Sequence, residues 1–180
     1  MSESDIAISY VLSKEKKLNT NPHDNGGTTN YGISLRFLRS IPPERLKQYG
    51  IFETPSDETI INLKEETARK IFYGEFWINA PFAKISNQDH ANYIFDMAVN
   101  MGINPAIKCV QRACWAVMKN RTLVDDGILG PKTLDAIKMC GLFLMPAMRS
   151  ERGGYYRLIL AHDNDEKEFI NGWLNRAYCA

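Results

Sequence analysis

The sequence has no run of about 20 consecutive apolar residues, the length that a helix needs to cross a bilayer. We therefore expect no membrane insertion. The first ten residues, MSESDIAISY, lack the basic segment and following apolar run that mark a secretory signal peptide. These two absences predict a protein made in the cytoplasm, which would need an assisted route to any substrate outside the membrane.

A strong charge of either sign is also missing. The chain has 22 Lys and Arg against 21 Asp and Glu, for a net charge of +1, so composition does not favour nucleic acid as a partner. The sequence has no Cys-x-x-Cys motif and no pair of histidines at metal-ligand spacing. We therefore expect no metal and no cofactor. Buried or idle thiols are favoured over a disulfide framework for the four cysteines, which are Cys109, Cys114, Cys140 and Cys179.

Strand-like alternation of apolar and polar residues is scarce, and helical spacing dominates. At 180 residues and 44% hydrophobic content, the chain can bury a core in one domain or two small ones. The predicted fold class is mainly α, with a polar loop or short hairpin between residues 19 and 32. Proline and glycine signals place the helices at 4–16, 33–39, 43–49, 64–77, 87–102, 105–119, 131–139, 142–161 and 166–179, with 50–63 the least regular part.

The polar loop begins beside one carboxylate and contains another. Glu15 follows Ile8 and Leu12 at helical spacing, so it continues an apolar stripe at the end of the first helix. Asp24 lies nine positions later, in a segment of small polar residues that cannot form core. An acid beside a polar loop that carries a second carboxylate is the usual construction of a sugar-cleaving site.

This region resembles the signature of glycoside hydrolase family 108, a family of muramidases found in phage endolysins and toxin-secretion systems. The matching residues are Glu15, then Asn21-Pro22-x-Asp24, then the run from Gly26 to Ile33, GGTTNYGI. Further matching blocks are 68–77, 95–102 (FDMAVNMG), 125–133 (DDGILGPKT) and 171–176 (NGWLNR). Lys16, Lys17 and Leu18 stand where the family has two glycines and an aromatic residue, which bears on substrate preference.

The resemblance implies a lysozyme-like fold, with a muramidase catalytic region at residues 1–92. A helical region at 93–180, similar to the family's predicted peptidoglycan domain, would pack on the first. The implied reaction is hydrolysis of the β-1,4 bond between N-acetylmuramic acid and N-acetylglucosamine, with Glu15 as general acid. Two alternatives remain open: a lytic transglycosylase that uses the same acid, and a wall-binding adaptor without activity.

Asp24 and Thr29 are the other candidate catalytic residues. Asp24 could position water, stabilise positive charge on the sugar ring, or only shape the loop as a turn residue. Related phage-type lysozymes have Glu, then Asp nine residues later, then Thr fifteen later. Here Thr29 is fourteen residues after Glu15, so its candidacy rests on an imperfect match.

Asn30 and Tyr31 are candidates for binding saccharide at the end of the loop. The alternative for Tyr31 is that its ring packs the loop down, while Gly32 merely allows the turn. Both interpretations stay open on the sequence alone.

Three further residues are candidate substrate contacts. Trp77 could stack on a sugar face, although a tryptophan at a helix end more often belongs to the core or its rim. Asp96 and Asn100 lie four apart on one helix face. A buried aspartate needs partners, so a polar pair that ties the first helix or the loop in place is an equal alternative.

The expected partner is peptidoglycan, with a holin-type pore or another export partner giving access to it, and the protein is expected to act as a monomer. The segment DDGILGPKT resembles the start of peptidoglycan-binding helical modules, but its matching residues are also those of an ordinary turn between helices. The sequence does not distinguish a phage lysis role from toxin export.

Overall fold

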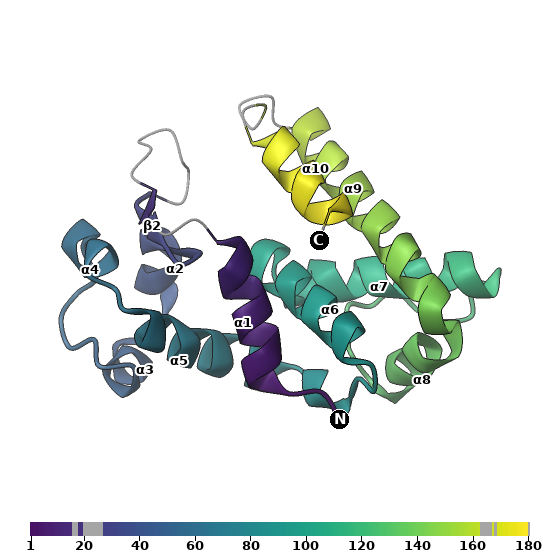
Figure 1. The fold of residues 1–180 in the computed structure, drawn as a ribbon, viewed down its shortest axis with the longest axis horizontal. Coiled ribbons are helices and arrows are strands. Elements are labelled where there is room, and N and C mark those ends of the chain that lie inside the picture. Colours follow the sequence, from purple (N-terminus) through teal and green to yellow (C-terminus); the bar gives the residue numbers. More distant parts are fainter. Residues whose placement is uncertain (16–17, 20–26, 163–166, 168, 180) are drawn as a thin grey trace. The chain divides into compact units, whose positions relative to one another are not determined.

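The computed structural model describes residues 1–15, 18–19, 27–162, 167 and 169–179 of the chain (Figure 1). It is mainly α-helical, as predicted, with three strands of two residues each in the described ranges. In chain order, the elements are α1 (Ser4–Lys14), β1 (Leu18–Asn19), β2 (Thr29–Asn30), β3 (Ile33–Ser34), α2 (Leu35–Ser40), α3 (Pro43–Gln48), α4 (Asp57–Ile61), α5 (Glu65–Glu75), η1 (Trp77–Asn79), η2 (Phe82–Lys84), α6 (Gln88–Met101), α7 (Ile103–Met118), α8 (Pro131–Cys140), η3 (Gly141–Phe143), α9 (Leu144–His162) and α10 (Ile170–Tyr178).

The chain divides into two compact units. One consists of residues 8–79, and the other of residues 1–7 together with 80–180. The expected boundary between residues 92 and 93 falls inside the continuous helix α6. The assignment of catalysis to 1–92 and of wall binding to 93–180 stays a prediction.

The unit of residues 8–79 carries the three-stranded antiparallel sheet, in the order β1-β2-β3. The helices that follow begin where their sequences dictate. Ser34 caps α2, because its hydroxyl accepts a hydrogen bond of 3.1 Å from the Phe37 amide. Ser56 and Thr59 form a capping box at the start of α4, within the segment that the sequence made least regular. The core of this unit is apolar and includes Val11, Ile33, Leu38, Ile60, Ile71 and Phe72.

The unit that contains residues 80–180 is a helical assembly around α6. Residues 90–98 of this helix are all buried, so its central part has no solvent face. Both α7 and α10 contact α9, and α9 and α10 lie side by side in Figure 1. Pro105 was expected to open a helix, but α7 begins two residues earlier, at Ile103. The first turn tolerates proline because its amides have no acceptor within the helix.

A buried ion cluster joins three helices of this unit. The Asp96 carboxylate on α6 accepts from Arg152 on α9 at 2.7 Å and from Arg176 on α10 at 2.6 Å. Burial alone would raise the pKa of Asp96, but the two arginines outweigh it and hold that pKa below its usual range. Because removing one partner would leave a buried charge uncompensated, the cluster fixes α9 and α10 on α6.

Within the described residues, no helix combines the length and apolar composition that crossing a membrane requires. No group of three or more His, Cys, Asp or Glu in the same ranges could hold a metal ion.

Candidate active site

Glu15 is the first residue after α1, where the apolar stripe of that helix ends. Its amide donates to the Leu12 carbonyl at 3.3 Å, and the residue is half-buried. The helix was expected to reach residue 16, but the structure ends it at Lys14. Glu15 therefore sits at the junction between a rigid helix and the polar segment that follows.

The Glu15 side chain lies directly on Gly32. A methyl group placed on the Gly32 Cα would come within 2.5 Å of the Glu15 Cδ, 2.8 Å of its Cγ and 2.9 Å of its Oε1. These distances are far below the 3.5–4.0 Å or so of ordinary carbon–carbon contact. With any other residue at this position, the Glu15 carboxyl group would have to move.

Gly32 belongs to a two-residue turn. Asn30 on β2 pairs with Ile33 on β3, so Tyr31 and Gly32 alone connect the strands. Both have positive φ, 53° for Tyr31 and 78° for Gly32, as the tight turns of hairpins require. A tyrosine in this left-handed region costs about 1–2 kcal/mol. Strain of this kind concentrates at functional sites, where the surrounding structure maintains it.

The hairpin is tied to the helix α4 by polar contacts. Asn30 is only 5% exposed, and its side-chain amide donates to the Ile60 carbonyl at 3.0 Å. The Thr28 hydroxyl donates to the Asp57 carboxylate in the first turn of the same helix. These contacts hold the turn on which Glu15 lies, and saccharide binding by Asn30 stays a prediction.

The other members of the predicted catalytic set differ in what the structure describes. Thr29 lies on β2, half-buried, and its hydroxyl donates to the Gly27 carbonyl at 3.2 Å. Asp24 lies outside the described residues. The structure thus brings Glu15 onto the turn that Thr29 and Asn30 lead into, and the role of Asp24 stays a prediction.

Of the three remaining candidates, one belongs to the unit of the turn and two belong to the other unit. Trp77 is 6% exposed in the core of the 8–79 unit, which leaves little of its ring for a sugar face. Asp96 is fully buried in the other unit, where its ion cluster leaves no surface for substrate. Asn100 is exposed there and donates to the Asp96 backbone carbonyl at 2.9 Å. One of the two interpretations of Asp96 was a polar tie to the first helix or the loop; its carboxylate pairs with α9 and α10.

The contact of Gly32 with Glu15 was not predicted from the sequence. Gly32 had been interpreted only as a residue that allows the turn. The available signal was the Tyr-Gly pair between two short polar segments, which is compatible with a two-residue hairpin. The contact with a side chain 17 positions earlier in the chain could not be read from that pair.

Comparisons with known proteins define the class. The family model described as glycosyl hydrolase 108 matches residues 8–102. The family model described as Predicted Peptidoglycan domain matches residues 105–178. Together these matches define a glycoside hydrolase that acts on peptidoglycan, with peptidoglycan as its partner. Since the first match covers more than half of the chain, the protein belongs to glycoside hydrolase family 108.

The fold is also that of a solved protein. The structure titled "Structure of Brucella abortus SagA" matches with a TM-score of 0.72 and 22% sequence identity, over 97% of this chain and 88% of that chain. At this identity the match concerns the fold alone, and it confirms the predicted lysozyme-like, mainly α architecture. Among curated proteins, none matches the chain.

Proposed function

We propose that this peptidoglycan hydrolase cleaves the β-1,4 bond between N-acetylmuramic acid and N-acetylglucosamine, with Glu15 as the general acid. The observation that carries the proposal is the packing of the Glu15 carboxyl group against Gly32, at the tight turn of a polar hairpin. A general acid must be held within hydrogen-bond reach of the oxygen that it protonates. The end of α1 on one side and the Gly32 backbone on the other support such a fixed position for the Glu15 carboxyl group.

In the proposed reaction, the protonated Glu15 carboxyl donates its proton to the glycosidic oxygen as the bond to the muramic acid C1 breaks. The departing N-acetylglucosamine keeps that oxygen as its 4-hydroxyl group, and the muramic acid ring gains oxocarbenium character. Water then adds its oxygen to C1. The proton lost by that water goes to a carboxylate, and Asp24 is the proposed acceptor.

Tyr31 is proposed to contact the saccharide beside the bond that is cleaved. This proposal is supported by the positive φ of Tyr31, a bulky residue next to Gly32. Backbone strain of this kind concentrates at functional sites, where a side chain is held in a particular direction. Thr29 is proposed to assist from the neighbouring strand.

The substitution Glu15→Gln tests the acid. The amide keeps the shape of the side chain but cannot donate the proton, so digestion of purified sacculi should fall by about 10²–10⁴-fold while the protein stays folded. Glu3→Gln removes an exposed carboxylate just before the same helix and should digest sacculi like the wild type. Activity of Glu15→Gln above about a tenth of the wild type would show that another residue supplies the proton.

Asp24→Asn tests the second carboxylate separately. We expect a smaller loss than for Glu15→Gln, because loop-held water can still reach the sugar. A loss as complete as that of the acid variant would make Asp24 an equal partner, and no loss would leave it a turn residue.

Mass spectrometry of the fragments distinguishes the reaction from its closest alternative. Reducing ends, which carry the mass of one added water, are expected for hydrolysis. Anhydro ends would show that the sugar closes on its own hydroxyl, as in a lytic transglycosylase. Binding to sacculi without any fragments would instead identify a wall-binding adaptor. Access to the wall through a pore-forming or export partner remains part of the proposal.

A further inference from the structure

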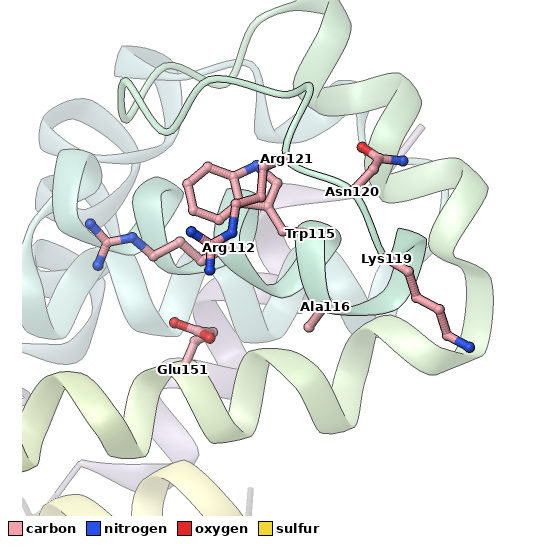
Figure 2. A pocket seen from close by; sticks show the side chains of 7 residues that line it. All are labelled: Arg112, Trp115, Ala116, Lys119, Asn120, Arg121 and Glu151. Atoms are coloured by element: carbon pink, nitrogen blue, oxygen red, sulfur yellow. The ribbon is translucent and has the colours of Figure 1, made fainter.

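A polar pocket of about 420 Å³ lies within the unit that contains residues 80–180 (Figure 2). It is formed by the C-terminal half of α7, the segment that follows this helix, and α9. The size suits a small ligand or a short piece of a polymer. Its lining residues are Arg112, Trp115, Ala116, Lys119, Asn120, Arg121 and Glu151.

The pocket carries a local excess of positive charge in a chain whose net charge is only +1. Three cationic side chains line it against the single carboxyl group of Glu151. A second carboxylate nearby, that of Asp125, is paired at 2.8 Å with the Nε of Arg112. The charges therefore favour an anionic ligand.

Several contacts fix the walls of the pocket. The indole Nε1 of Trp115 donates to the Leu123 carbonyl at 2.6 Å, so the ring is held in one orientation. The Arg121 guanidinium lies 5.5 Å from the centre of that ring, an arrangement of the cation–π kind. Figure 2 shows these two side chains at the end of the pocket that Arg112 and Glu151 share, with Lys119 and Asn120 at the other end.

The backbone at Lys119 turns the chain at the end of α7. This residue ends α7 in the left-handed conformation, with φ of 55°, which glycine would adopt at lower cost. The conformation directs the chain so that Lys119, Asn120 and Arg121 all line the pocket. Arg112, Lys119, Asn120 and Arg121 are exposed, so a ligand can reach them from solvent.

Glu151 is compatible with an anionic ligand. Burial raises the pKa of its carboxyl group, and the nearby Arg112 opposes this shift only in part. The carboxyl group therefore takes up a proton more readily than an exposed glutamate does.

We propose that this pocket binds the free carboxylates of peptidoglycan stem peptides, at a site separate from the acid at Glu15. All lining residues fall within the region that matches the Predicted Peptidoglycan domain, and the proposal rests on peptidoglycan being the substrate. Two arginine guanidinium groups match the planar shape of carboxylates. A neutral glycan chain carries no negative charge that could pair with the three cationic side chains. A second attachment to the same polymer raises the effective concentration of the bond to be cleaved.

The probe is a tetrapeptide of the stem type with free carboxyl groups, titrated calorimetrically against the full-length protein. Arg121→Gln should weaken its binding about tenfold, as expected for the loss of one charge-assisted hydrogen bond. Lys138→Gln removes the same charge from an exposed position on α8 outside the pocket and should bind like the wild type. The same peptide with its carboxyl groups amidated should bind at least tenfold more weakly than the free acid.

Lys119→Gly provides a second test that does not depend on how Arg121 packs on the tryptophan. Glycine suits the left-handed backbone, so this variant should fold, and its loss of one ammonium group should also weaken peptide binding. Equal affinity of both pocket variants and the wild type would overturn the proposal. Binding of a peptide-free glycan or of an oligonucleotide in preference to the acidic peptide would overturn it as well.

These titrations do not depend on catalysis. If Glu15→Gln still cleaves sacculi but Arg121→Gln loses peptide affinity, the assignment of the acid is wrong and the pocket stands. If Glu15→Gln is inactive and the pocket variants bind normally, the reverse holds.

Discussion

The contact between Glu15 and Gly32 makes a quantitative prediction about Gly32→Ala. The added methyl carbon would lie 2.5 Å from the Glu15 Cδ, so the carboxyl group must retreat by about 1 Å to reach ordinary contact distance. A displacement of about 1 Å in a catalytic group can cost about 10²-fold in rate. We therefore expect kcat on a soluble peptidoglycan fragment to fall by about 10²-fold, with a smaller change in KM.

The backbone conformation adds a separate effect, which needs its own control. Alanine at a φ of 78° is disfavoured by about 1–2 kcal/mol, and this loss should appear as a lower denaturant midpoint. Gly50 has a similar φ of 83°, but a methyl group there would meet nothing within 4 Å. Gly50→Ala should thus lose a similar amount of stability and keep its activity.

The comparison of the two variants decides whether Gly32 acts through Glu15. In the double variant Gly32→Ala, Glu15→Gln, the glycine substitution should cause little further loss of activity, because the group that it displaces is already inactive. Equal activity of Gly32→Ala and Gly50→Ala would refute the reasoning. So would an independent, multiplicative loss in the double variant.

Two further predictions concern buried groups. Asp96→Asn should lower the free energy of unfolding by about 3–5 kcal/mol at pH 7. The folded-state pKa of Asp96 is depressed. The stability difference should therefore be complete above the ordinary carboxyl pKa of about 3.9 and shrink as the pH falls through the folded-state pKa. Urea titrations at pH 7 and pH 3 that gave equal stability differences would contradict this prediction. Burial raises the pKa of Cys109 to about 11 and also raises the pKa values of Cys114 and Cys140. At pH 8, a thiol reagent should therefore label the exposed Cys179 fast and the other three cysteines only on unfolding. A second thiol that reacts fast in the native protein would contradict this prediction.

Helix positions were largely predictable because their signals are local. Pro131 opens α8 as expected, and Gly102 follows the last residue of α6. The short helix α4 was not predicted, although Ser56 and Thr59 form a capping box at its start. The early start of α7 shows the limit of reading proline as a first residue, because the whole first turn can accept it.

The site was predictable only as far as its local pattern reached. Glu15 could be selected from the apolar stripe and the polar loop beyond it. Trp77 and Asp96 could not be assigned from sequence, because burial depends on partners far away in the chain. The two arginines that neutralise Asp96 are 56 and 80 positions distant, and no pattern around the aspartate indicates them.

The order of synthesis gives the discontinuous unit a consequence of its own. Residues 1–7 leave the ribosome before residues 80–180, with which they form one compact unit. The Ser2 hydroxyl donates to the Phe82 carbonyl at 2.6 Å, and the Glu3 amide donates to the Gln88 side chain at 2.7 Å. Ser2 and Glu3 can therefore make these contacts only after Phe82 and Gln88 have emerged. Removal of residues 1–7 would therefore destabilise the unit that residues 80–180 complete.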